Sequence, residues 1–217
     1  MPPGEAPPSR SHRGAIVGIV VVAVLLVGAS AVAGFTNRSQ PKAWEGTVLA
    51  PAPAKPDFTL TDTSGRPYDF QARTKGQLTF LYFGYTHCPD VCPITLATLT
   101  GALGSLPGVA ATVVFVTTDP ARDTPARLRS WLDGYDTHYV GLTGTPAQLA
   151  AAQRAAGVTV ATANAPSKDG NYTVGHAASV LVYTPDGHEH LTFPFGITQG
   201  GWQHDIPKML SIASWNR

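Results

Sequence analysis

Short apolar runs alternate with segments of helical periodicity over residues 57–217. Residues 57–62, DFTLTD, alternate apolar and polar side chains, which is typical of a half-buried strand. Residues 77–85, QLTFLYFGY, are apolar on both faces, and this pattern predicts a central strand that is covered on two sides. Further strands are predicted at residues 66–70, 111–119 and 138–144, and as two arms of a hairpin within residues 172–195.

The predicted helices lie between these strands. Residues 124–135 begin with Thr124 as the N-cap and Pro125 in the first turn, a preferred helix start. The same Thr-Pro start recurs at Thr145, and that helix is predicted to stop at Gly157. Further helices are predicted at residues 93–106 and 202–215. This order predicts an α/β fold, a mixed sheet flanked by helices on both faces as in a thioredoxin-like domain.

The N-terminal region contains a long uncharged segment, AIVGIVVVAVLLVGASAVA, at residues 15–33. A helix of this length, at ~1.5 Å per residue, approaches the ~30 Å of a bilayer core. We therefore predict one transmembrane anchor over residues 15–35 of a single-pass cell-membrane protein. Arg10 and Arg13 place residues 1–14 in the cytoplasm and the rest of the chain outside it. A signal peptide, cut after ASAVA or left uncleaved, is the alternative.

Residues 36–56 are rich in proline and alanine, and they predict a semi-rigid linker that ends where the domain at residues 57–217 begins. The formal net charge of the chain is +1, and the part after the apolar segment carries 13 basic and 13 acidic residues. A neutral domain lacks the positive field that holds DNA or RNA, so nucleic acid is excluded as a partner.

The two cysteines of the chain, Cys88 and Cys92, follow the central strand. Pro93 suits the first position of the next helix, which would make Cys92 its N-cap, and the positive helix end favours a thiolate there. The pattern allows a structural disulfide, a redox dithiol or a metal site. The disulfide would close a very short loop and stabilise little, and the redox signature is usually C-x-x-C rather than C-x-x-x-C. Two thiolates suit Cu(I) or zinc, and zinc would want four ligands.

The segment FGYTHCPDVCP, residues 83–93, resembles the copper-binding motif of the Sco (SenC) proteins. The likeness continues in TTDPARDTPARLRSWL at residues 117–132 and in VGLTGTPAQL at residues 140–149, and it covers roughly residue 57 to the C-terminus. Members of this family are membrane-anchored, thioredoxin-fold copper chaperones for cytochrome c oxidase. The resemblance therefore implies the same fold and a copper-binding domain for residues 57–217.

The resemblance also implies a copper site formed by Cys88, Cys92 and one distant histidine. The family's histidine lies in a Y-x-V-D-H-S/T segment, which matches NYTVGHAASVLVY here and identifies His176. Gly175 and Ala177 stand where the family has Asp and Ser or Thr, so either another group orients the imidazole or metal retention is weaker. The same match implies a supporting role beside the ligands for Asp119, and we expect Arg122 and Asp123 to form a local turn and cap network.

Two main functions are compatible with these residues. A copper carrier would hold Cu(I), accept Cu(II) with adjustment, take copper from a donor protein and deliver it to the dinuclear site in subunit II of cytochrome c oxidase. Such transfer is not enzymatic turnover. A thiol–disulfide oxidoreductase would instead use Cys88 and Cys92 to reduce the cysteines of that recipient, without His176. A redox or copper sensor with a signalling partner is a third, non-catalytic alternative.

Overall fold

The computed structural model describes residues 43–215 of the 217 residues. The predicted anchor at residues 15–35 lies outside these residues, as does the first part of the predicted linker. Within residues 43–215, no helix is both long enough and apolar enough to cross a membrane. The folded unit begins at Trp44.

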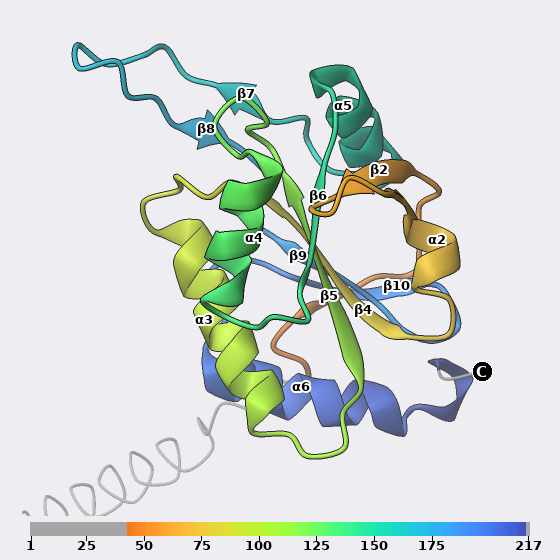
Figure 1. Cartoon of the computed structure of the whole chain (residues 1–217). Coiled ribbons are helices and arrows are strands. Elements are labelled where there is room, and N and C mark those ends of the chain that lie inside the picture. Colours follow the sequence, from red (N-terminus) through yellow and green to blue (C-terminus); the bar gives the residue numbers. More distant parts are fainter. Residues whose placement is uncertain (1–42, 216–217) are drawn as a thin grey trace, which may run out of the picture. The chain divides into compact units, whose positions relative to one another are not determined.

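A mixed sheet forms the centre of the domain (Figure 1). Its strands lie in the order β1 (Thr47–Val48), β10 (Glu189–Phe193), β9 (Val180–Tyr183), β4 (Leu78–Gly84), β5 (Ala111–Thr117), β6 (Val140–Thr143), β2 (Thr59–Asp62) and β3 (Pro67–Asp69). β4, β5 and β6 run parallel, and the other neighbouring strands are antiparallel. This is the mixed α/β sheet that the apolar pattern predicts.

The central strand β4 supplies both hydrophobic cores. Every residue of β4 is buried, because β5 and β9 cover its edges and helices cover its faces. Phe80 and Tyr82 face a core built with α3 (Val91–Gly104), α4 (Pro125–Asp133) and α6 (Gln199–Ser211). Leu81 and Phe83 face a second core with α2 (Phe70–Arg73) and α5 (Pro146–Ala155). The strand is thus fixed on all sides, and its carboxyl end is a rigid base for the loop that follows.

Side-chain caps determine where the helices begin. Thr124 and Thr145 cap α4 and α5 as predicted, and Gly157 follows α5 with a positive φ of 69°. Thr198 caps α6, so this helix begins three residues earlier than predicted. The predicted cap of α3 is wrong: Asp90 is the N-cap, and its carboxylate accepts the Val91 N–H at 2.6 Å. A carboxylate caps better than a thiol, and Cys92 therefore lies inside the first turn.

Residues 44–56, which composition assigns to a linker, belong to the folded unit. β1 pairs with β10, and the Leu49 N–H donates to the carbonyl oxygen of His190 at 3.0 Å. The Lys55 side chain is only 4% exposed, and its Nζ donates to the carbonyl oxygen of Thr74 at 2.8 Å. The domain boundary therefore moves from residue 57 to Trp44. These contacts depend on residues distant in sequence, and a proline-rich composition does not reveal them.

A two-stranded arm, residues 162–175, projects from the body of the domain (Figure 1). Its strands are β7 (Thr162–Ala163) and β8 (Val174–Gly175), which pair in antiparallel fashion. The hairpin predicted within residues 172–195 is confirmed in β9 and β10, which pair in antiparallel fashion. Its first arm is shorter than predicted, because β8 pairs with β7 and β9 starts only at Val180. The connection between β8 and β9 carries His176. The 3-10 helix η1 (Ala213–Trp215) ends the described chain.

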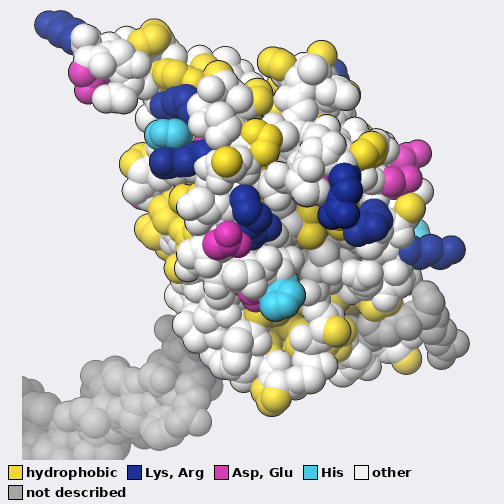
Figure 2. Space-filling view, in the orientation of Figure 1, with side chains coloured by type: hydrophobic (Ala, Val, Ile, Leu, Met, Phe, Trp, Pro, Cys, Tyr) yellow, Lys and Arg dark blue, Asp and Glu magenta, His cyan; other side chains and the backbone are white. Residues whose placement is uncertain are grey.

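The surface of the face drawn in Figure 2 is mostly uncharged. Lys and Arg side chains lie there in small separate groups, some of them next to acidic side chains (Figure 2). On α4, Arg129 and Asp133 form an ion pair at 2.8 Å. A partner of this face would therefore be recognised by a few local contacts, because no broad field of one sign covers it.

Candidate metal centre

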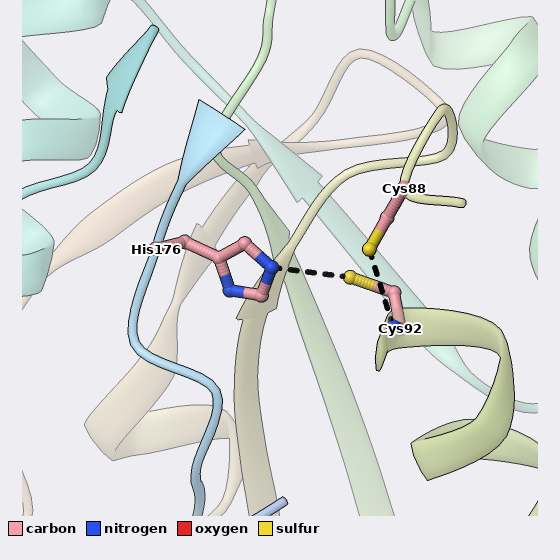
Figure 3. A group of neighbouring side chains, drawn as sticks. All are labelled: Cys88, Cys92 and His176. Carbon is pink, nitrogen blue, oxygen red and sulfur yellow. Dashed lines mark hydrogen bonds between the residues drawn. The ribbon is translucent and has the colours of Figure 1, made fainter. Parts of the chain in front are cut away.

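Cys88, Cys92 and His176 meet at the carboxyl end of β4 (Figure 3). Cys88 lies in the loop after β4, Cys92 in the first turn of α3, and His176 just after the arm. Their ligand atoms all lie within 4.8 Å of one another, and Cys92 Sγ is 3.4 Å from His176 Nε2. Two cysteines that are close in sequence and a histidine 84 positions after the second one thus form a single cluster.

Cys88 carries the more acidic thiol. Its Sγ accepts the Cys92 N–H at 3.3 Å, at the positive end of α3, and the residue is 9% exposed. The pKa of Cys88 is lowered to about 5, chiefly by the hydrogen bond from the Cys92 side chain, and also by the Cys92 N–H, against the opposing effect of burial. At neutral pH, Cys88 is therefore a thiolate with restricted access to solvent.

Cys92 has the opposite environment. It is completely buried, and its hydrogen bond to Cys88 together with burial raises its pKa far above the ordinary thiol range. The two cysteines are not joined in a disulfide. The pair therefore holds one proton at neutral pH, and that proton must leave when both sulfurs bind one metal ion.

We predict that iodoacetamide labels Cys88 selectively in the reduced, copper-free protein. Because the pKa of Cys88 is lowered, its thiolate persists down to about pH 5, whereas an ordinary thiol loses it below ~8.5. The labelling rate should therefore fall as the pH drops through about 5, and Cys92 should stay unlabelled while the protein is folded. Peptide mass spectrometry over this pH range measures both rates. Equal labelling of both cysteines, or a midpoint near 8.5, would contradict the prediction.

His176 presents one nitrogen to the sulfurs. Its Nδ1 lies 3.0 Å from the carbonyl oxygen of Ala177, so this nitrogen donates and Nε2 is left with a lone pair facing Cys92. The rings of Tyr85 and Tyr82 stand edge-on to the imidazole, with centroids 5.7 Å and 6.2 Å away. A backbone carbonyl thus supplies the acceptor that Gly175 and Ala177 do not supply through their side chains.

Asp123 anchors the loop that carries Cys88. Its buried carboxylate accepts the Thr86 N–H at 3.0 Å, the Thr86 hydroxyl at 2.6 Å and the Thr117 hydroxyl at 2.7 Å. The backbone of Asp123 forms the expected local turn, with its N–H donating to the Asp119 carbonyl oxygen, but its side chain ties the loop to the end of β5 instead of capping a helix. His87 turns toward this carboxylate, with Nδ1 3.6 Å from Asp123 Oδ1, and it is outside the cluster of three side chains that could hold a metal ion.

Asp119 is outside the cluster of Cys88, Cys92 and His176 and contacts the arm. It is 4% exposed, and its carboxylate accepts the Arg122 Nε–H and, at 2.9 Å, the Tyr172 hydroxyl. Arg122 also reaches the arm, where Nη1 donates to the carbonyl oxygen of Tyr172 at 3.0 Å. The sequence analysis missed this contact, because nothing in the spacing of two residues 50 positions apart indicates it.

An open cleft of about 350 Å³ separates the cysteine loop from the arm. His87 and Pro89, the chain neighbours of Cys88, line one side, and Asn171, Tyr172 and Thr173 contribute to the other. A ligand in this cleft would therefore contact the two chain neighbours of Cys88. Cys88 itself is 9% exposed, and Cys92 is completely enclosed.

The sequence matches a family model described as SCO1/SenC over residues 47–211. A protein of Stutzerimonas stutzeri named for copper binding is 34% identical over 162 residues, which are 72% of this chain and 77% of that protein. The mitochondrial SCO2 homologue of Bos taurus is 36% identical over 135 residues, 60% of this chain and 50% of that protein. The matched region thus spans only half of that mitochondrial relative.

Solved structures with copper bound are also similar to the domain. The copper-bound ScoI structure of Bradyrhizobium japonicum is 35% identical, with a TM-score of 0.62, and the match covers 72% of this chain and 99% of that one. Copper-bound yeast Sco1 is 27% identical, with a TM-score of 0.67 and coverage of 75% and 90%. These matches confirm the thioredoxin-like α/β fold that the order of elements predicts.

Proposed function

The chain belongs to the SCO1/SenC family, and from that premise we propose that it is a membrane-anchored carrier that delivers copper to subunit II of cytochrome c oxidase. The observation that carries the proposal is the cluster of two sulfurs and one imidazole nitrogen within 4.8 Å. Relatives with copper bound support the choice of metal. Anchoring by residues 15–35 and an extracytoplasmic domain are part of the proposal, and they rest on the sequence.

The donor set fits copper as cargo. Two thiolates and a neutral imidazole suit Cu(I), and the imidazole also suits Cu(II). Bonds of about 2.0–2.3 Å place two ligand atoms of one ion at most ~4.6 Å apart, so only a small contraction of the cluster is needed. Structural zinc wants four protein ligands, and the described residues offer three at this position. With only three protein ligands, the metal keeps room for an incoming ligand, which suits an ion that is held and then passed on.

The two cysteines would exchange copper unequally. Cys88 is already a thiolate, and its chain neighbours His87 and Pro89 line the cleft, so an incoming ligand can reach this loop and bind the metal before Cys88 leaves. Cys92 is enclosed and favours its protonated form, so its return to the thiol assists release. An associative exchange of this kind keeps free copper out of solution while the ion passes to its recipient.

A second function uses the same asymmetry. The Cys88 thiolate could attack a disulfide of the recipient and form a mixed disulfide, releasing one recipient thiolate. Cys92, after losing its proton to solvent, would then attack Cys88 Sγ, which frees the second recipient thiolate and leaves a Cys88–Cys92 disulfide. The recipient is reduced by two electrons and this protein is oxidised by two. The low pKa of Cys88 favours this alternative, which needs no His176.

The proposal is tested by copper uptake in the two redox states. We expect the reduced protein to bind one Cu(I) per chain, and the oxidised protein to bind none, because a disulfide offers no thiolates. Metal analysis after desalting, with Cu(I) supplied by a weak chelator, measures both. His188→Ala, which removes a half-exposed imidazole outside the cluster, is the control and should change nothing. Equal uptake in both redox states would contradict a thiolate site.

A further inference from the structure

Asp119, Arg122 and Tyr172, here called the clamp, hold the arm against the connection between β5 and α4. The Asp119 carboxylate accepts from Arg122 Nε and from the Tyr172 hydroxyl, and Arg122 Nη1 donates to the Tyr172 carbonyl. The Arg122 guanidinium also lies 3.6 Å from the centroid of the Tyr172 ring. The ring, hydroxyl and carbonyl of Tyr172 are thus all fixed by two residues of the β5–α4 connection.

A second attachment lies two residues further along the arm. The Val174 N–H donates to the Tyr85 hydroxyl at 3.2 Å, and Tyr85 lies at the start of the cysteine loop. The Arg122 guanidinium is 5.7 Å from the Tyr85 ring, so it also stands next to this attachment. Both attachments join the arm to the segments that carry or support Cys88.

The rest of the arm offers little support to His176. Its ladder consists of two residue pairs, Thr162 with Gly175 and Ala163 with Val174. A ladder this short is not stable alone in water. Gly175, the only residue between Val174 and His176, has no side chain to pack, and a Cβ at this position would meet only the Thr162 carbonyl oxygen, at 3.7 Å. Besides the Ala177 carbonyl and the two tyrosine rings beside the imidazole, the attachments at Tyr172 and Val174 therefore fix the segment that leads to His176.

We propose that the clamp positions His176 toward Cys92 and thereby sets how long copper is retained. This inference rests on the proposed copper function. Neither Arg122 nor Tyr172 belongs to the cluster of metal-ligating side chains. Both act through the chain segment that leads to His176. When the segment is fixed, Nε2 stays near the sulfurs, and a metal ion meets three ligands already in place. When the segment is loose, the two sulfurs still hold the metal, but the imidazole dissociates from it easily.

The test compares copper release from clamp variants and matched controls. Arg122→Lys keeps the charge next to Asp119 but loses the planar stack, and Tyr172→Leu loses ring and hydroxyl. Tyr172→Phe keeps the ring and should show a smaller effect. Arg129→Lys and Tyr139→Phe are the controls, since they alter an arginine on α4 and a hydroxyl bonded to Thr100, away from the arm. Each change is made with and without His176→Ala.

With His176 present, Arg122→Lys and Tyr172→Leu should release Cu(I) to a strong chelator ~10–100-fold faster. This factor is the usual loss of metal affinity when a residue that orients a metal ligand is removed. Their Cu(II) spectra should shift toward that of His176→Ala. In the His176→Ala background the same changes should add nothing, because their effect passes through the imidazole. An unchanged release rate, or an equal acceleration without His176, would overturn the proposal.

The copper-free protein provides an independent measurement. Amide hydrogen exchange over residues 172–176 should be faster in Arg122→Lys and Tyr172→Leu than in either control, while exchange in β4 stays unchanged. If the natural protein binds no copper, the carrier function fails, and this exchange experiment alone decides whether the clamp orders the segment. Unchanged exchange over residues 172–176 would overturn the clamp itself.

Discussion

Cys88→Ser and Cys92→Ser should each lower the affinity for Cu(I) by more than ~10–100-fold, which is the usual loss when a residue that only supports a metal ligand is removed. Either change leaves one thiolate and one imidazole, a poor donor set for a soft ion. Competition with a Cu(I) chelator of known affinity measures the loss. Thermal unfolding of the copper-free variants provides the control that both are folded.

The two serine variants should differ in stability. Cys92 is fully buried, so a serine there places a hydroxyl among apolar groups, whereas Cys88 is 9% exposed and lies in the loop after β4. We therefore expect Cys92→Ser to unfold at the lower temperature. If Cys88→Ser retained the affinity of the natural protein, copper would be held by another set of residues, and the assignment of this cluster would be wrong.

Gly84→Ala should destabilise the domain by ~1–3 kcal/mol, the usual range for overpacking a core. Gly84 ends β4, and a Cβ there would stand 2.8 Å from Cys92 Sγ and 2.9 Å from Phe115 Cε2. Both neighbours are buried, and real Cβ contacts are not this short. The Cys92 sulfur must therefore move, and the affinity for Cu(I) should fall together with the free energy of unfolding.

Gly104→Ala is the matched control for this prediction. A Cβ at Gly104, the last residue of α3, would meet nothing within 4 Å, and alanine is the better helix former. Denaturant unfolding of the copper-free proteins should show a loss only for Gly84→Ala. Equal stabilities, with copper affinity unchanged, would mean that β4 and α3 are not packed as closely as described.

Local patterns were sufficient to predict much of the fold. The apolar run of β4 and the Thr-Pro starts of α4 and α5 are confirmed, because burial on both faces and side-chain capping leave a signature in adjacent residues. Contacts between distant segments leave no such signature. The pairing of β1 with β10 and the burial of Lys55 are of this kind, and composition assigned both to a linker.

For the candidate site, too, the sequence reveals some features and not others. The spacing of Cys88 and Cys92 marks them as reactive, but only the resemblance to a family identified His176 as their partner. The sequence could not show that the Ala177 carbonyl orients the imidazole, since every residue has a carbonyl. Nor could it show that Arg122 reaches Tyr172. Such support depends on where the arm lies, which the fold alone determines.

The most direct test of the carrier function is the assembly of cytochrome c oxidase in cells that express His176→Ala, Cys88→Ser or Cys92→Ser at limiting copper. Dithiol exchange runs through sulfur alone, so a reductase would keep working without His176. We predict that all three variants lose oxidase activity, and that added copper partly restores only His176→Ala. Full oxidase activity of His176→Ala at limiting copper, with both serine variants inactive, would contradict the carrier and favour the reductase.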